Sequence, residues 1–139
     1  MAELDSITLI PIGIVRSELT ERAEAPMQGY EGAPEAWIEV DEDVTDGLKD
    51  VEVGQEVILI TWFHQAERDV LQVHPRSDTT RPLSGVFATR SPDRPNPLGL
   101  HRVTVLEVEE GRLKVEPLEA IDGTPVVDIK PVLDRSNDA

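Results

Sequence analysis

Apolar and polar residues alternate along most of this chain, and the alternation predicts short β-strands rather than helices. Val103, Val105 and Val108 have polar neighbours, a turn signal follows at residues 110–111, and the pattern then resumes, so residues 103–118 are expected to form a hairpin. Further strands are expected at residues 7–15, 37–40, 56–63, 69–74, 86–88 and 126–129. The run at 56–63 is almost entirely apolar, which indicates a strand buried on both faces.

The segments between these runs have the composition of turns and loops. Residues 17–34 contain two prolines and two glycines without a regular period, which is typical of a long loop. Residues 43–51 are expected to hold one turn of helix capped by Asp43, and residues 134–139 to form a disordered tail. A mainly β fold follows: a single compact β-barrel of about seven short strands over residues 1–139, with long loops and little helix.

The charge of the chain is strongly negative but unevenly distributed. A net charge of −15 argues at first against a nucleic acid as partner. Between residues 74 and 102, however, five arginines outnumber two aspartates, so this stretch carries +3 and the remainder −18. Scarce lysine and abundant acidic residues suit a protein that works in concentrated salt, and a halophilic source is one hypothesis; an acidic mesophilic protein has the same composition.

Several classes of site are excluded or disfavoured. Cysteine is absent, which removes disulfides, thiolate metal ligands and a cysteine nucleophile. The three histidines are too scattered to predict a metal site, and none of the common nucleophile or phosphate-binding motifs is present. No apolar run is long enough to span a membrane and no basic, then apolar segment opens the chain, so a soluble cytoplasmic protein without a membrane partner is expected.

The stretch from residue 85 to residue 100 differs most from ordinary connecting sequence. It contains three prolines, each of which fixes its own φ and favours an extended residue before it, so the loop is expected to be rigid. Its hydrogen-bond donors, Thr89, Arg90, Ser91, Arg94 and Asn96, would then stand at fixed positions that suit an anionic or nucleotide-like ligand. The alternative is a proline-rich connector whose arginines pair with carboxylates of the same chain.

Polar residues in other loops extend this candidate site. His64 and Gln65 follow the apolar run at 56–63, where side chains are easily directed into a pocket, although His64 has an alternative role as a strand cap satisfied by backbone groups. The segment 26–30 and the Asp-Gly turn at residues 122–125 are further candidates. The residues themselves therefore indicate a ligand-binding β-domain and no specific reaction.

Three segments together resemble one known family. Residues 85–100, with the order Ala-Thr-Arg-Ser-Pro-Asp-Arg-Pro-Asn-Pro-Leu-Gly-Leu, residues 122–131 and residues 11–17 are similar to the signatures of the TrmO-like (TsaA-like or YaeB-like) family. The resemblance implies a small β-barrel, a homodimer, and S-adenosylmethionine-dependent methylation of tRNA at N6 of threonylcarbamoyladenosine beside the anticodon. It agrees with the strands expected above and with the absence of a glycine-rich dinucleotide motif.

The resemblance also implies functional positions. Cofactor contacts are expected at Pro26, Met27, Gln28, His64, Gln65, Arg90, Leu100, Glu119, Ala120, Ile121 and Asp122. RNA contacts are expected at Arg76, Arg81, Arg94, Asn96 and Arg102, with Arg94 and Asn96 alternatively bracing their own loop. Leu100 would pack against adenine, Asp122 would accept from a ribose hydroxyl or the cofactor amine, and either His64 or Asp122 would accept the proton that methylation releases.

Some positions depart from the family pattern. Met27 stands where the family usually has arginine, and Val132 where it tends to have an aromatic residue after Lys-Pro. Many bacterial members also have a further C-terminal domain. Three functions therefore stay open: a tRNA methyltransferase, a non-catalytic module that binds S-adenosylmethionine or a related nucleoside, and a methyltransferase for another small substrate.

Overall fold

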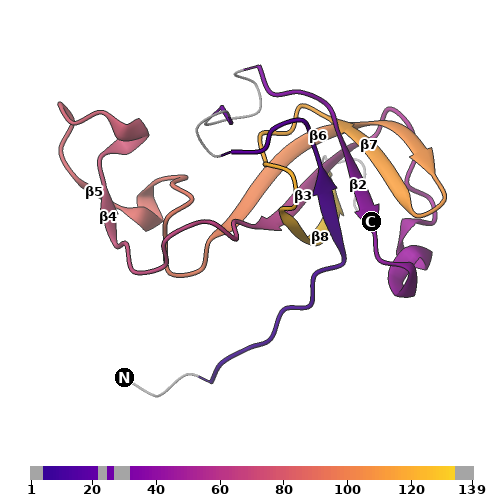
Figure 1. Cartoon of the computed structure of the whole chain (residues 1–139), viewed down its shortest axis with the longest axis horizontal. Helices are drawn as coiled ribbons and strands as arrows, with labels where there is room; N and C mark the ends of the chain where they lie inside the picture. The colour runs from indigo at the N-terminus through magenta and orange to yellow at the C-terminus, as the bar shows by residue number, and fades with distance from the viewer. Residues whose placement is uncertain (1–4, 22–24, 27–31, 134–139) are drawn as a thin grey trace.

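The computed structural model describes residues 5–21, 25–26 and 32–133, and its body is a closed antiparallel barrel (Figure 1). Going round the barrel, the strand order is β1-β2-β7-β6-β3-β8. The strands are β1 (Gly13–Arg16), β2 (Ala36–Val40), β3 (Glu56–Trp62), β6 (Leu98–Glu109), β7 (Arg112–Glu116) and β8 (Pro125–Pro131). The predicted mainly β fold, with a barrel and little helix, is therefore confirmed.

The inward side chains of the six strands form one apolar core. Its fully buried members are mostly β-branched or leucine, which suits a pleated wall that is covered on one side only. They include Val15, Ile38, Leu59, Val103, Val105, Leu113, Val115 and Val126. Along β3 the inner residues are buried and the alternate residues stay partly exposed, so the expectation that this strand is buried on both faces is wrong.

The longest strand, β6, organises the barrel because it pairs with both β3 and β7. The predicted hairpin is confirmed: β6 runs into β7 through residues 110–111, with Gly111 at φ 76°. A positive φ costs glycine little because it has no Cβ. The register of β6 against β7 shifts between Val105 and Glu107, a bulge that bends the strand round the barrel.

Three predicted strands are much shorter than expected or absent. Of residues 7–15, only those from Gly13 onward belong to β1; residues 7–11 extend away from the barrel, with Ile7 and Ile10 87% and 79% exposed (Figure 1). Residues 69–74 contain only the two-residue β4 (Gln72–Val73). Residues 86–88 form the 3₁₀ helix η5 (Val86–Ala88) instead of a strand. Apolar composition alone did not reveal that these segments lack a neighbouring barrel strand to pair with.

A long excursion, called the arm below, leaves the barrel after β3 and returns at β6 with residues 64–97. Its only sheet is the pair of β4 with β5 (Ser84–Gly85), and the short 3₁₀ helix η4 (Pro75–Ser77) lies between them. Figure 1 shows the arm projecting from one side of the barrel. The stretch that the sequence singled out therefore runs along the arm and ends within the first residues of β6.

The one other helical element of the described chain is the 3₁₀ helix η3 (Glu42–Leu48) between β2 and β3. Its cap is Asp41, whose carboxylate accepts from the Asp43 amide at 2.9 Å, so the expected cap at Asp43 is wrong by two positions. Among the described residues no helix is long and apolar enough to cross a lipid bilayer. The predicted tail at residues 134–139 lies outside the described residues.

Candidate functional site

Arg94 holds the proline-containing loop of the arm in shape. Its guanidinium donates to three backbone carbonyls: Ser91 at 2.7 Å, Val86 at 2.6 Å and Thr89 at 2.5 Å. A planar five-donor group can satisfy several carbonyls at once, which a lysine ammonium does less well in a fixed geometry. Of the two roles open to Arg94, a loop brace and an RNA contact, the geometry therefore supports the brace.

Arg68 ties the same loop to the segment that follows β3. Its Nε donates to the Pro95 carbonyl at 2.7 Å, its Nη2 donates to the Asn96 side-chain oxygen at 3.2 Å, and its guanidinium lies 5.0 Å from the Trp62 ring centroid. Asn96 is thus one partner in this tie. The sequence analysis did not name Arg68 as a loop contact. The one indication in the sequence was its position, six residues after the end of β3.

A second tie brings the 64–69 segment and the arginine loop together. The Arg94 amide donates to the Glu67 carbonyl at 3.0 Å, and the Glu67 amide donates to the Asp93 carboxylate at 2.9 Å. His64 and Gln65, both exposed, lie just before this tie at the end of β3. The structure therefore joins two of the loops that the sequence nominated for one site.

The barrel holds a polar trio, His101, Thr61 and Glu119, of which the sequence analysis predicted only Glu119 as a site residue. His101 points inward from β6; its Nε2 lies 2.6 Å from the Thr61 hydroxyl and its Nδ1 lies 2.5 Å from Oε1 of Glu119. The side chain of His101 is 1% exposed and that of Glu119 is 12% exposed. The available signal was the alternation of β6, which places His101 on the same inner face as Val103 and Val105.

Gly99 provides the space for this trio. A Cβ at Gly99 would overlap the Phe63 ring and would lie 2.7 Å from the Thr61 hydroxyl oxygen. The Phe63 ring meets the His101 ring edge to face, with centroids 5.7 Å apart. Close approach of the Phe63 ring therefore requires glycine at this point of β6.

Glu119 is the first of four predicted cofactor positions in the loop between β7 and β8, residues 117–124. Ala120 and Ile121 are buried, so only their backbone groups could meet a ligand. Asp122 is half-buried: it accepts from the Ser17 amide at 3.1 Å, and its own amide donates to the Leu19 carbonyl at 2.6 Å. The two carboxylates, Glu119 and Asp122, are therefore both fixed by named partners, three positions apart.

Asp122 also borders a shallow hollow of about 420 Å³ on the outer wall of β1, β2 and β7. Trp37 forms part of its lining, with the Arg112 guanidinium 3.9 Å from the indole centroid and the Lys114 ammonium 5.7 Å from it. Lys114 is paired with Glu35 and Glu107, at 2.9 Å and 3.2 Å, which raise the pKa of the Lys114 amine. The hollow is polar and internally neutralised.

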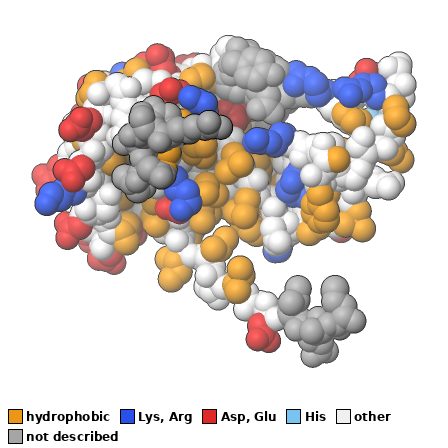
Figure 2. Space-filling view, turned by 180° about the vertical axis from the view of Figure 1, so that it is seen from behind, with side chains coloured by type: hydrophobic (Ala, Val, Ile, Leu, Met, Phe, Trp, Pro, Cys, Tyr) orange, Lys and Arg blue, Asp and Glu red, His pale blue; other side chains and the backbone are white. Residues whose placement is uncertain are grey.

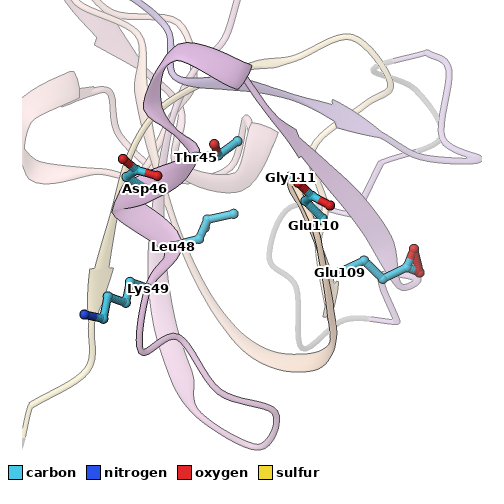
Figure 3. Close-up of a pocket in the computed structure, with 7 residues that line it drawn as sticks. All are labelled: Thr45, Asp46, Leu48, Lys49, Glu109, Glu110 and Gly111. Atoms are coloured by element: carbon cyan, nitrogen blue, oxygen red, sulfur yellow. The ribbon is translucent and has the colours of Figure 1, made fainter.

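A larger hollow, of about 570 Å³, lies between η3 and the β6–β7 turn (Figure 3). None of the predicted site residues lines it; the lining consists of Thr45, Asp46, Leu48, Lys49, Glu109, Glu110 and Gly111. It is open and acidic, and it lies beside the β6–β7 turn, at the end of β6 that is away from the arm. The candidate site therefore lies at the arm end of the barrel, where the predicted site residues are, and not at the larger hollow.

The remaining predicted cofactor positions differ in their location and exposure. Leu100 lies on the outer wall, 48% exposed, opposite Ile60 of β3 and next to His101 in the chain. Arg90 is exposed on the arm, and Pro26 is half-buried. Met27 and Gln28 lie outside the described residues. The cofactor roles of these residues stay predictions.

The arginines predicted to contact RNA are distributed over the arm and the barrel wall. Arg76 and Arg81 are exposed near η4, and Figure 2 shows basic side chains spread along the arm. Arg102 lies on the barrel instead, where its guanidinium donates to both Glu56 carboxylate oxygens at 2.9 Å and 3.1 Å. This pair lowers the pKa of Glu56 and raises that of Arg102. Arg102 therefore has an internal partner.

Comparison with known proteins identifies relatives across almost the whole chain. Residues 14–138 match the model of the tRNA-methyltransferase O N-terminal domain. An S-adenosyl-L-methionine-binding protein from Archaeoglobus fulgidus is 45% identical over 122 residues, covering 88% of this chain and 86% of that protein. A crystal structure of TrmO from P. aeruginosa superposes with a TM-score of 0.75 at 34% identity over 94% of this chain. Another TrmO crystal structure superposes with a TM-score of 0.74 at 33% identity over 95% of this chain. This chain spans only 56% and 57% of the two TrmO chains.

Proposed function

The chain belongs to the family of the tRNA-methyltransferase O N-terminal domain, and from this membership we propose that it is an S-adenosylmethionine-dependent methyltransferase that acts on tRNA. The observation that carries the proposal is the likeness to TrmO over 94% of the chain at 34% identity. The finer proposal is that the methyl acceptor is N6 of threonylcarbamoyladenosine beside the anticodon. The exposed arginines of the arm, Arg76, Arg81 and Arg90, support an anionic substrate.

The chemical groups at the arm end of the barrel fit S-adenosylmethionine. The cofactor offers hydroxyl and ammonium donors, a carboxylate and an apolar adenine face. Against these, the described chain presents the carboxylates of Glu119 and Asp122, the exposed guanidinium of Arg90 and the exposed side chain of Leu100. Arg90 would pair with the cofactor carboxylate and Leu100 would pack against adenine.

The reaction asks little of the protein beyond placement and acceptance of a proton. The bound cofactor supplies a methyl group already activated by the positive sulfur. The protein holds the acceptor nitrogen in line with that methyl group, which removes the orientational cost of the reaction. Asp122, fixed by the Ser17 amide and facing the outer hollow, or the exposed His64 accepts the proton that the nitrogen loses.

The arm is proposed to serve both the tRNA and a second copy of the chain. Arg76 and Arg81 would meet phosphates, because both are exposed near its tip. The same arm exposes three large apolar side chains to solvent: Leu71 at 63%, Leu83 at 55% and Phe87 at 80%. Apolar surface grouped in this way is typical of a contact with another protein. A homodimer that covers these side chains is therefore proposed. A cytoplasmic location likewise remains a proposal.

A second function, a non-catalytic module that binds S-adenosylmethionine, is favoured by one observation. The relative from Archaeoglobus fulgidus is named only for binding S-adenosyl-L-methionine, and this chain covers 86% of it. In contrast, the chain covers only 56% of a TrmO chain.

An assay with methyl-labelled S-adenosylmethionine and tRNA that lacks endogenous N6-methylation separates the two functions. We expect label in the threonylcarbamoyl-modified nucleoside, and none in tRNA that lacks the threonylcarbamoyl group. Arg76→Ala and Arg81→Ala should lower tRNA methylation while leaving cofactor binding unchanged. Intact cofactor binding with no label in any tRNA, at saturating enzyme, would favour the binding module. Activity unaffected by both arginine changes would point to a different, small acceptor.

A further inference from the structure

The carboxylate of Glu119 has acceptor capacity that its partners among the described residues do not use. An ionised carboxylate can accept about four hydrogen bonds, yet the described residues give Glu119 one side-chain partner, the imidazole of His101. The described chain contains no buried side-chain polar atom without a partner, so the unused oxygen lies at the edge of Glu119 that remains exposed. A largely buried carboxylate with one open edge is suited to receive a donor from a ligand.

His101 cannot itself touch that ligand. Its side chain is 1% exposed, and both ring nitrogens are engaged, Nδ1 by Glu119 and Nε2 by Thr61. Since the Glu119 carboxylate only accepts hydrogen bonds, the His101 Nδ1 atom carries the hydrogen of the contact between them. Thr61 is fully buried, so the chain of contacts ends there and cannot carry a proton from one side of the barrel wall to another. The arrangement is therefore one of positioning rather than of proton relay.

Packing leaves His101 little freedom to turn. The Phe63 ring meets the imidazole edge to face at 5.7 Å, and the space for Phe63 exists only because residue 99 is glycine. The Thr61 hydroxyl then selects one ring orientation. A buried hydrogen-bonded group that fixes a site carboxylate is a common way of holding it within the narrow geometry that binding requires.

We infer that His101, oriented by Thr61, is a positioning residue that holds the Glu119 carboxylate so that its open oxygen accepts a hydrogen bond from the bound cofactor. This inference rests on the proposed function. The donor is either a ribose hydroxyl or the ammonium of the amino-acid part, since both groups can donate to a carboxylate oxygen. It assigns a role to two residues, Thr61 and His101, that lie outside the predicted cofactor positions.

The test is calorimetric binding of S-adenosylhomocysteine and of 5′-methylthioadenosine, which keeps the ribose but lacks the ammonium, to the full chain. Thr61→Val, which removes only the hydroxyl, and Glu119→Gln should each weaken binding about tenfold. Thr61→Ser, which keeps a hydroxyl, should bind within about threefold of the wild type. His101→Asn keeps a donor to Glu119 but loses the contact with Thr61, so its affinity should lie between those of the wild type and Thr61→Val. Thr45→Val, which removes a hydroxyl on η3 that bonds the Glu42 carbonyl, is the matched control and should bind as the wild type does.

The outcomes separate this inference from the proposed function. An equal loss for both ligands assigns the donor to the ribose, and a loss for S-adenosylhomocysteine alone assigns it to the ammonium. Wild-type binding that Thr61→Val and Glu119→Gln leave unchanged overturns the inference and leaves the proposed function standing. Failure of the wild type to bind either ligand overturns both. Loss in Thr61→Ser and His101→Asn equal to that in Thr61→Val contradicts positioning and indicates disrupted packing.

Discussion

The Nη2 atom of Arg94 lies 2.6 Å from the carbonyl oxygen of Val86, eight positions earlier in the chain, and the same guanidinium donates to the carbonyls of Thr89 and Ser91. One side chain thus closes the loop that carries Arg90. The loop's shape depends on this contact as well as on its prolines, because proline restricts φ but supplies no bond across the loop.

Arg94→Ala should therefore loosen the loop without unfolding the barrel. We expect faster amide hydrogen exchange at Thr89 and Ser91, because their local turn loses the brace, and unchanged exchange in β3 and β6. Nuclear magnetic resonance measures both regions in one sample. Arg94→Lys should behave more like alanine than like arginine, since an ammonium cannot hold three carbonyls in one plane. Slow exchange in the alanine variant would show that the prolines suffice.

Arg90→Ala should weaken cofactor binding with little effect on folding. The side chain is exposed and near the brace but outside it, so its loss removes one charged contact, worth about tenfold in affinity. The free energy of unfolding should change by no more than about 0.5 kcal/mol. Calorimetry with S-adenosylhomocysteine and urea denaturation measure the two quantities. Unchanged affinity would remove Arg90 from the cofactor site.

Gly99→Ala should destabilise the barrel by about 1–3 kcal/mol, because the new methyl group would overlap the Phe63 ring and crowd the Thr61 hydroxyl. Chemical denaturation measures the change. Gly47→Ala is the matched control: no atom lies within 4 Å of its added Cβ, so its effect should stay within about 0.5 kcal/mol. Equal stability of the two variants would mean that Phe63 can move away at little cost.

The pair of Arg102 and Glu56 predicts a small pH effect on the acid side. The hydrogen bonds and charge of Arg102 lower the pKa of Glu56 below its ordinary 4.5. The contribution of the pair to the stability of the fold is therefore complete above pH 4.5, and it is lost as the pH falls through the lowered pKa. Arg102→Gln should return the Glu56 pKa toward 4.5, which a carboxyl carbon titration measures. The titration of Asp78, which Thr80 holds, is the internal control and should not move.

Phe87→Ser should shift the proposed homodimer toward monomer. Phe87 is 80% exposed on the arm, and an aromatic side chain at the centre of an interface commonly carries a large part of its binding energy. We expect the dissociation constant of the dimer to rise about tenfold or more, measured by sedimentation equilibrium. Val53→Ser, at an exposed position before the Gly54 turn, is the control. A wild type that sediments as a monomer at all concentrations contradicts the dimer.

The barrel could be predicted because its strands alternate between a buried and an exposed face, and the hairpin of β6 with β7 shows this most clearly. The pattern fails where a segment has apolar residues but no partner strand. Val86 is buried and Phe87 exposed within a single turn of 3₁₀ helix, and their residue types resemble those of a strand.

The functional loops could be named from the sequence, but their contacts could not. Arg94 and Asn96 had two open roles because nothing near them in the chain reveals that Arg94 faces carbonyls or that Arg68, 28 positions before Asn96, reaches it. His101 meets one partner 40 positions before it and another 18 positions after it. Only closure of the barrel brings these residues together.

Three successive residues of β6 alternate between two surroundings: Leu100 and Arg102 face outward, and His101 between them faces the interior. A strand tolerates exchange of one side chain more readily than a change in the number of residues, because inserting or deleting one reverses every face beyond that point. Such a slip would carry Arg102 into the core and His101 into water. We therefore expect homologous chains to differ here by replacement and not by gaps, and libraries that vary the length of β6 to return few folded members.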